Sequence, residues 1–296
     1  MKPIDSLRLI LLAAIWGSSY LFMRLAAPVL GVLLTIGIRL SLAALVLILY
    51  AATTRQLPEV KRFWRAYLTM GLLNNVLPFL MITTAVVNLN ASISSILNAT
   101  TPLFTAIVAA VWLKERLSWL QILGLVLGVT GVGILVGWSP LPITPVVIWS
   151  AALALLGAFF YGFTAVYARR TFVNTQPIKT TTGQLVGSSL IFLPVTVASI
   201  PHQAPPVSAL LAAAALAVVC TAYAYFLYFQ LITSTGATRA SMVTFLIPVF
   251  SLVWGSVFLG EPINSGLLIG LATILLSLWL VMGVKTIRSP LPARPS

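Results

Sequence analysis

Ten apolar segments, each close to 20 residues long, constrain this chain more than any other feature. They cover approximately residues 7–27, 31–51, 66–87, 91–112, 119–137, 147–168, 180–199, 208–232, 238–259 and 264–283. Because a helix needs about 20 apolar residues to cross the roughly 30 Å core of a bilayer, each segment predicts one transmembrane helix. The composition agrees, since 60% of the residues are hydrophobic and 7% are charged. The expected fold class is therefore an all-α integral membrane protein with ten transmembrane helices.

The second half of the sequence repeats the first half. Placing Ala91 on Ala237 aligns, without a gap, Ser95 with Ser241, Pro102 with Pro248, Glu115 with Glu261 and Gly124 with Gly270. Five spans therefore recur as five spans, and an odd number inserts the second copy from the opposite face of the membrane. We predict two inverted five-helix repeats around a central cavity, covering residues 1–145 and 146–285, followed by a cytoplasmic tail at 286–296.

Positive charge predicts the orientation of the chain. Apart from Arg24 and Arg39, all of the 17 Lys and Arg residues fall in or beside the connections that share a membrane face with the N-terminus. Positively charged loops stay in the cytoplasm, so both termini of this multi-pass protein should be cytoplasmic. The net charge of +13 is explained in this way, and we do not expect a nucleic-acid partner.

The sequence offers little for catalysis or metal binding. Cys220 is the single cysteine and His202 the single histidine, so neither a thiolate cluster nor a nucleophile with a histidine base is indicated. No Asp or Glu lies inside a predicted span, which argues against a proton relay of carboxylates. We also expect no cleavable signal peptide, because the first apolar segment leads directly to Pro28 and a second span. We therefore expect a protein that is not an enzyme and has no cofactor.

Small polar side chains form a stripe on the fourth span and a matching stripe on the ninth. The stripes comprise Ser94, Asn98, Thr101 and Thr105 in the first copy, and Ser241, Thr244, Pro248 and Ser251 in the second. The spacing of three and four residues places each set on one helical face. These groups either line a cavity that binds a polar metabolite or satisfy the backbone carbonyls that the prolines free. Both interpretations remain open from the sequence.

Aromatic side chains provide a second set of candidate cavity residues. Those deepest in the spans are Trp16, Tyr20, Phe79, Tyr161, Tyr223 and Tyr225, and the third span adds Asn74 and Asn75. A buried tyrosine hydroxyl needs a polar partner, so these residues should face the protein interior rather than lipid. In contrast, Tyr167 and Tyr228 lie near span ends, where an interfacial aromatic belt is the favoured interpretation.

Arg24 and Arg39 are the basic residues placed within or at the ends of spans. Arg39 either binds a substrate carboxylate or extends toward the outer headgroups, and we favour the second interpretation for both arginines.

The chain resembles the drug/metabolite transporter superfamily, specifically its ten-span EamA-like members. The motifs that carry the resemblance are Trp16-Gly-Ser-Ser-Tyr20, Thr101-Pro-Leu-Phe-Thr105 with Leu113-Lys-Glu-Arg-Leu117, and Ile247-Pro-Val-Phe-Ser251 with Leu259-Gly-Glu-Pro262. The resemblance covers essentially the whole chain. It implies a cavity lined mainly by spans one, three, four, six, eight and nine. It also implies efflux of amino acids or similar metabolites from a bacterial cytoplasm, across the inner (plasma) membrane. The aromatic residues are similar to those of the family's aromatic amino-acid exporter type.

The function expected is export of amino acids, including aromatic or other apolar ones, or of similar small metabolites by alternating access. A multidrug or other metabolite facilitator, a passive channel and a non-transporting scaffold are the alternatives. The predicted partners are a small-molecule substrate and the lipid bilayer. The predicted substrate-binding residues are Trp16, Tyr20, Asn74, Phe79, Ser94, Asn98, Thr101, Tyr161, Tyr225, Ser241 and Thr244.

Overall fold

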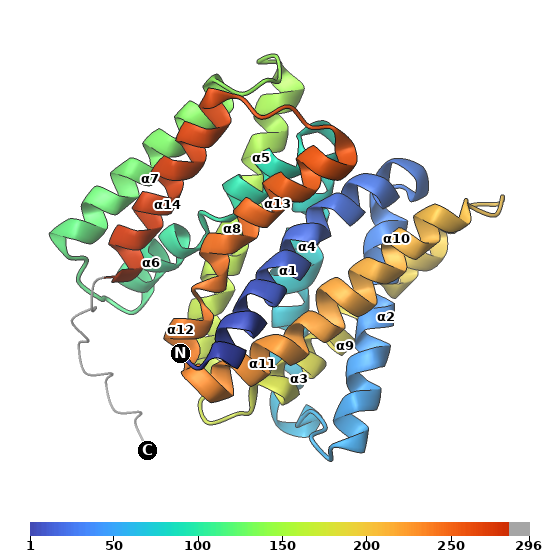
Figure 1. Cartoon of the computed structure of the whole chain (residues 1–296). Helices are drawn as coiled ribbons and strands as arrows, with labels where there is room; N and C mark the ends of the chain where they lie inside the picture. The colour runs from blue at the N-terminus through green and yellow to red at the C-terminus, as the bar shows by residue number, and fades with distance from the viewer. Residues whose placement is uncertain (284–296) are drawn as a thin grey trace.

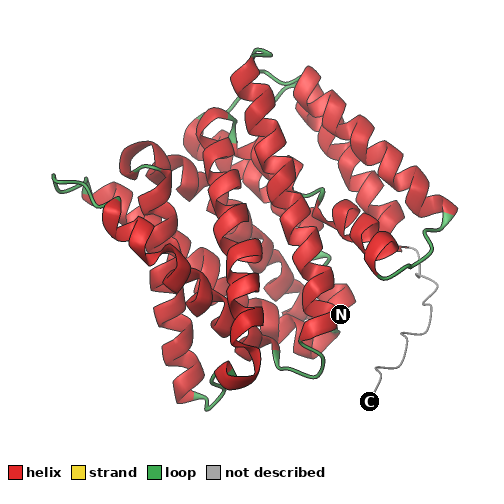
Figure 2. Ribbon diagram, turned by 180° about the vertical axis from the view of Figure 1, so that it is seen from behind, coloured by secondary structure: helices red, strands yellow, loops and turns green. Residues whose placement is uncertain are grey.

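The computed structural model describes residues 1–283, which form helices joined by short connections (Figures 1 and 2). Within this range there is no strand, nine helical segments are long and apolar enough to cross a membrane, and a further apolar helix, Val243–Leu259, is shorter. The all-helical, multi-pass class is thus confirmed. The predicted tail, 286–296, lies outside the described residues.

The first five spans are built from seven α-helices and one π-helical segment. Their bounds are α1 Pro3–Leu30, α2 Val32–Thr53, α3 Val60–Met70, η1 Gly71–Val76, α4 Leu77–Asn88, α5 Ala91–Asn98, α6 Thr101–Trp112 and α7 Trp119–Gly137. The third span consists of α3, η1 and α4, and the fourth of α5 and α6. A single residue, Gly31, joins α1 to α2, and its φ of 77° lies in a region that favours glycine.

The second five spans follow the same plan with local differences. Their bounds are α8 Pro145–Thr171, α9 Pro177–Ala198, α10 Val207–Ala217, η2 Val218–Tyr223, α11 Ala224–Thr235, α12 Ala237–Ala240, α13 Val243–Leu259 and α14 Ser265–Gly283. Like the third span, the eighth is interrupted by a six-residue π-helical segment. Both copies therefore place the same irregular element at the same point of the corresponding span.

The two repeated prolines lie in different local structures. Pro102 stands at the start of α6, directly after the turn that ends α5. Pro248 instead lies inside α13, and the break in this copy comes earlier, at Ser241 and Met242. The helix break therefore differs in position between the two copies, and α13 continues through Pro248, where one backbone donor is missing.

Close contacts between spans recur in the two halves. A Cβ on Gly17 of α1 would lie 2.8 Å from the Cβ of Phe250 in α13. A Cβ on Gly162 of α8 would lie 2.9 Å from the Cβ of Phe104 in α6. Glycine therefore permits backbone contact between spans one and nine, and equally between spans six and four. These paired contacts support a repeat, while the inverted orientation of the halves stays a prediction.

The fifth and tenth spans pack along each other at one edge of the molecule, where α7 and α14 run side by side in Figures 1 and 2. Ser277 of α14 donates a 2.7 Å hydrogen bond to the carbonyl of Gly124 in α7. At one end of the pair, the Gln121 amide donates to the carbonyl of Val281 at 3.3 Å. These side-chain contacts tie the last span of each half to the other.

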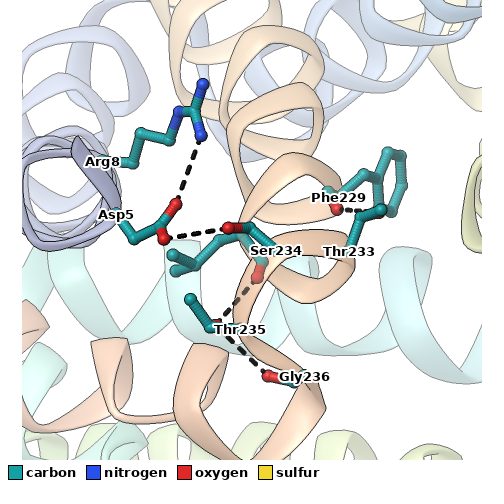
Figure 3. A network of polar contacts seen from close by, with 8 residues as sticks. Asp5, Arg8, Phe229, Thr233, Ser234, Thr235 and Gly236 are labelled. Atoms are coloured by element: carbon teal, nitrogen blue, oxygen red, sulfur yellow. Dashed lines mark hydrogen bonds and ion pairs between the residues drawn. The ribbon is translucent and has the colours of Figure 1, made fainter. Parts of the chain in front are cut away.

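A small polar network joins the beginning of α1 to the end of α11 (Figure 3). Asp5 is only 2% exposed, and its carboxylate accepts hydrogen bonds from Arg8 at 3.3 Å and from Ser234 at 2.9 Å. Nearby, Thr233 and Thr235 donate to backbone carbonyls of their own helix. A buried carboxylate needs such partners, so this network fixes the first span against the eighth.

Candidate functional site

A cavity of about 350 Å³ lies between the two halves of the chain. It is lined by aromatic, small polar and aliphatic side chains from α1, α2, η1, α4, α5, α6, α8, η2, α11 and the region of α12 and α13. The lining residues are Trp16, Ser19, Tyr20, Met23, Arg39, Asn74, Phe79, Ile82, Ser95, Asn98, Ala99, Thr101, Pro102, Tyr161, Cys220, Thr221, Tyr225, Tyr228, Ser241, Val243, Thr244 and Ile247. A mostly apolar cavity with a few polar groups is typical of a small-molecule site.

Most of the side chains predicted from the sequence to contact a substrate lie on this cavity. They are Trp16, Tyr20, Asn74, Phe79, Asn98, Thr101, Tyr161, Tyr225, Ser241 and Thr244. Ser94 is the exception, because it is fully buried and is not among the lining residues. Its neighbour Ser95 lines the cavity instead, together with Asn98 and Ala99. The cavity-facing side of α5 is therefore the one that carries Ser95, and the placement predicted for Ser94 was wrong.

Asn98 and Tyr20 form a polar pair on the cavity wall. The Asn98 side-chain amide donates a 2.8 Å hydrogen bond to the Tyr20 hydroxyl. Its other polar atom, Oδ1, is buried and has no hydrogen-bond partner among the described residues. An unsatisfied buried acceptor costs about 1–3 kcal/mol. A ligand that donates a hydrogen bond at this point would remove that cost.

The threonines of the two stripes are already bonded to the backbone. Thr101 donates to the carbonyl of Asn98 at 2.7 Å, and Thr244 donates to the carbonyl of Ser241 at 2.8 Å. Thr105 donates to the carbonyl of Thr101 at 2.9 Å and does not line the cavity. These hydroxyls thus satisfy carbonyls near the helix breaks, as one of the two sequence interpretations predicted. Because each O–H group already donates to a carbonyl, these hydroxyls can only accept a hydrogen bond from a ligand.

Aromatic rings form the apolar part of the wall. The ring centroids of Trp16 and Tyr225 are 6.2 Å apart in an edge-to-face arrangement, and those of Trp16 and Tyr228 are 5.3 Å apart. Tyr228 therefore belongs to the cavity, and its assignment to an interfacial belt was wrong. The expectation for Tyr223 was also wrong, since its side chain is 44% exposed on the outer surface. These rings pack against one another and form an apolar wall, which suits contact with a flat apolar group.

The two π-helical segments bring polar residues to opposite sides of the cavity. Asn74 of η1 accepts a 2.7 Å hydrogen bond from Thr164 and donates to Gln184 at 3.3 Å. In η2, Thr221 donates to the carbonyl of Leu216, five residues earlier, at 2.8 Å. Such interruptions are frequent at functional sites because they turn a side chain out of the regular helical register. Sequence reasoning missed Thr221, since hydrophobic spacing carries no signal for a π-helical turn.

Arg39 lies inside the cavity and not at the membrane surface. Its side chain is buried, with 8% exposure, and its Nε donates to the Thr221 hydroxyl at 3.1 Å. The guanidinium carbon sits 3.8 Å from the centroid of the Phe79 ring, and Nη1 contacts the sulfur of Met23 at 3.8 Å. The favoured interpretation, in which Arg39 extends to the headgroups, was therefore wrong. The position of a residue along a span predicts its depth in the membrane, but it does not predict the direction in which the side chain points.

Arg24 has a different role from Arg39. Its guanidinium donates to the carbonyls of Val86, at 2.8 Å, and Val87, both in the last turn of α4. The final carbonyls of a helix have no partner within the helix, and a cation there is favourable. Arg24 is thus a capping group for the third span, and neither lines the cavity nor needs the lipid headgroups.

The two repeated glutamates have unequal partners. Glu261 accepts hydrogen bonds from the backbone N–H groups of Ala91, at 2.6 Å, and Ser92, at 3.1 Å, and from the Ser92 hydroxyl at 2.7 Å. It therefore clamps the start of α5 onto the end of α13. Glu115 instead pairs with the largely exposed guanidinium of Arg169. The two equivalent carboxylates therefore hold different segments: Glu261 holds the start of α5, and Glu115 holds Arg169 in the last turn of α8.

Apolar membrane-spanning helices that surround a polar and aromatic cavity define a multi-pass membrane transporter. The profile of the EamA-like transporter family matches residues 6–137 and again residues 148–283. The chain belongs to the EamA-like transporter family. Two matches of one profile, each covering about half of the chain, also agree with the internal repeat seen in the sequence.

Several relatives along nearly the whole chain are transporters by name. The uncharacterized transporter YvbV of Bacillus subtilis is 29% identical over 287 residues, covering 95% of this chain and 92% of the relative. The uncharacterized inner membrane transporter YedA of Escherichia coli K12 is 26% identical, covering 95% and 90%. Protein PecM of Dickeya dadantii is also 26% identical, covering 92% and 90%. One solved structure, described only as the crystal structure of a protein, superposes with a TM-score of 0.65 at 17% identity over 95% of this chain and 98% of its own, which shows a shared fold.

Proposed function

We propose that this chain exports amino acids, including aromatic or other apolar ones, or similar small metabolites by alternating access. Transport, and not catalysis, is the proposed activity. The observation that carries the proposal is the cavity itself, in which the paired polar groups of Asn98 and Tyr20 face the aromatic wall of Trp16 and Tyr225. A cavity between two repeats is the usual location of a transporter's substrate site.

The unequal ends of the cavity support alternating access. Glu261 holds α5 at one end through three hydrogen bonds, whereas Glu115 makes an ion pair with Arg169 on the surface. In alternating access the two ends of the cavity are closed alternately. The repeated segments at the two ends should therefore have different conformations in any one state. We propose that the clamped end is the external one in this conformation.

Counterflow in proteoliposomes tests the transport proposal. Vesicles preloaded with unlabelled substrate should accumulate labelled substrate transiently and with saturation, for at least one amino acid or related metabolite. Asn98→Ala and Tyr225→Ala should reduce the initial rate about tenfold or more, because each removes a group that lines the cavity. Ser94→Ala is the matched control, since Ser94 is buried one position from the cavity face and should keep the original rate.

The same experiment separates the alternatives. A passive channel would give flux without saturation and without counterflow, and a non-transporting scaffold would give rates equal to empty vesicles. A multidrug facilitator would carry apolar cations that have no relation to amino acids. Any of these results would overturn export of amino acids or similar metabolites by alternating access.

We also propose that the protein lies in a bacterial inner membrane with both termini in the cytoplasm. The relative YedA is named an inner membrane transporter, and the basic residues cluster in alternate connections. Fusion of a reporter that fluoresces only in the cytoplasm to either terminus should give signal in both cases. A fusion of alkaline phosphatase, which is active only outside the cytoplasm, should be inactive at both positions; activity at either terminus would overturn this topology.

A further inference from the structure

Arg39 is a buried cation without an anionic partner. The four ion pairs among the described residues join Arg8, Arg62, Arg169 and Lys179 to carboxylates, and none includes Arg39. A guanidinium has five N–H donors, and here Nε is taken by Thr221 and one donor faces the weakly accepting sulfur of Met23. The remaining donors have no protein acceptor among residues 1–283. A charge in this position is costly within a membrane unless something compensates it.

The rest of the cavity wall carries no negative charge to balance it. No Asp or Glu occurs among the lining residues. The four acidic residues of the chain lie elsewhere, and each has a partner outside the cavity: Asp5 with Arg8 and Ser234, Glu59 with Arg62 and Lys179, Glu115 with Arg169, and Glu261 with the start of α5. The cavity is therefore a positively charged site, and a ligand's ammonium group would find no carboxylate in it.

The equivalent position in the other half shows that the charge is not required for packing. Arg39 is the eighth residue of α2 and contacts Thr221, the fourth residue of η2. Gln184 is the eighth residue of α9 and contacts Asn74, the fourth residue of η1. A neutral glutamine thus makes the same contact between a span and a π-helical segment that Arg39 makes with a cation. What Arg39 adds to this arrangement is positive charge and additional donors.

We propose that the cavity binds organic monocarboxylates, with Arg39 holding the carboxylate and the aromatic wall holding the apolar group. This inference rests on the proposed transport function and narrows it from zwitterionic amino acids to acids that lack an ammonium group. The guanidinium carbon lies 3.8 Å from the centroid of the Phe79 ring, which offers no acceptor oxygen, so the N–H donors not used by Thr221 and Met23 are left for a carboxylate. Trp16 and Tyr225, which pack edge to face, then provide the apolar wall for an aromatic or branched side group.

Three ligands that share one phenyl group test the charge preference directly. They are 3-phenylpropanoate, which has only the carboxylate, phenylethylamine, which has only the ammonium, and phenylalanine, which has both. Titration calorimetry on the purified chain in detergent should give the tightest binding for 3-phenylpropanoate, at least tenfold weaker binding for phenylalanine and none for phenylethylamine. Equal or tighter binding of phenylalanine or phenylethylamine would overturn the inference.

Variants of Arg39 and Arg24 test whether the preference for a carboxylate depends on Arg39. Arg39→Gln should weaken 3-phenylpropanoate binding about 100-fold, because the anion loses its buried partner. Arg39→Lys should retain part of the affinity, since it keeps the charge but not the planar fork. Arg24→Lys is the matched control and should bind as the unchanged chain does, because Arg24 caps α4 away from the cavity. Full affinity in Arg39→Gln would overturn the inference.

The binding assay and the transport assay separate failure of this inference from failure of the proposed function. Arg39-dependent binding of 3-phenylpropanoate without counterflow would support the site and count against transport. Counterflow of amino acids without carboxylate binding would support transport and overturn the site. If Arg39→Gln does not elute as a single folded species, the three-ligand comparison on the unchanged chain still tests whether the cavity prefers a carboxylate.

Discussion

Glu261 should control whether one end of the cavity is open, and Glu261→Gln tests this. The carboxylate accepts three hydrogen bonds from the start of α5: from Ala91 N–H at 2.6 Å, from Ser92 N–H at 3.1 Å and from the Ser92 hydroxyl at 2.7 Å. Glutamine keeps one accepting oxygen, but its NH₂ group replaces the second oxygen, which accepts the hydrogen bond from Ser92 N–H. That hydrogen bond is therefore lost. A hydrogen bond to a charged group contributes about 1.5–3 kcal/mol. Loss of negative charge at the start of a helix adds about 0.3–1 kcal/mol.

The combined loss is about 3 kcal/mol, which corresponds to roughly a 100-fold shift toward conformations in which α5 is released. Hydrogen exchange measures this shift at the amides of Ala91 and Ser92, which should exchange on the order of 100-fold faster. The single cysteine, Cys220, lines the cavity and is 1% exposed. It should react at least tenfold faster with a membrane-impermeant maleimide added from the side where α5 begins.

Glu115→Gln is the matched control, since Glu115 occupies the equivalent position of the repeat. Among the described residues its ion-pair partner is Arg169, whose side chain is 53% exposed, while that of Glu115 is 11% exposed. Because solvent screens the exposed guanidinium, this pair should contribute no more than about 1 kcal/mol. Exchange at α5 and labelling of Cys220 should therefore change less than about fivefold. Unchanged exchange in Glu261→Gln, or equal effects of the two substitutions, would refute the assignment of Glu261 as the closing group.

Three other substitutions test the packing around the site by thermal unfolding in detergent. Gly17→Val should destabilise the chain by about 1–3 kcal/mol, because even a Cβ would lie 2.8 Å from that of Phe250, whereas Gly133→Ala meets nothing within 4 Å and should be neutral. Arg24→Met should cost about 1–3 kcal/mol by leaving carbonyls at the end of α4 without their partner; an unchanged melting temperature would exclude the capping role. Asp5→Ala should also cost about 1–3 kcal/mol through its lost hydrogen bonds, and an unchanged stability would show that the network in Figure 3 is dispensable.

The sequence was sufficient for the class of fold and for ten of the 22 residues that line the cavity. Span length is a direct physical requirement of the bilayer, so apolar segments near 20 residues located the spans. Trp16, Tyr225 and Asn98 were predictable because large aromatic and amide groups are unfavourable in lipid and must face the interior. The internal repeat added a second line of support, because it indicated which polar residues belong to corresponding positions.

The sequence was insufficient where local geometry decides the direction of a side chain. A π-helical turn holds an extra residue, and no hydrophobic spacing signals it, so Thr221 was not predicted. Ser94 and Ser95 are adjacent small polar residues, and only the packing of α5 shows that Ser95 faces the cavity. Arg39 was placed correctly in depth but given the wrong direction, because its partner Thr221 is 182 residues away in the sequence.

The structure also shows how one repeated sequence can serve two different local conformations. Residues 91–98 form an eight-residue helix held by Glu261, whereas the matching segment forms a four-residue helix, Ala237–Ala240, and then a turn. Pro102 begins a helix, and Pro248 lies within one. If both copies had the same conformation, the two ends of the cavity would be open together or closed together. A transporter that works by alternating access must avoid this, so unequal conformations of nearly equivalent segments support the proposed mechanism more strongly than the repeat alone does.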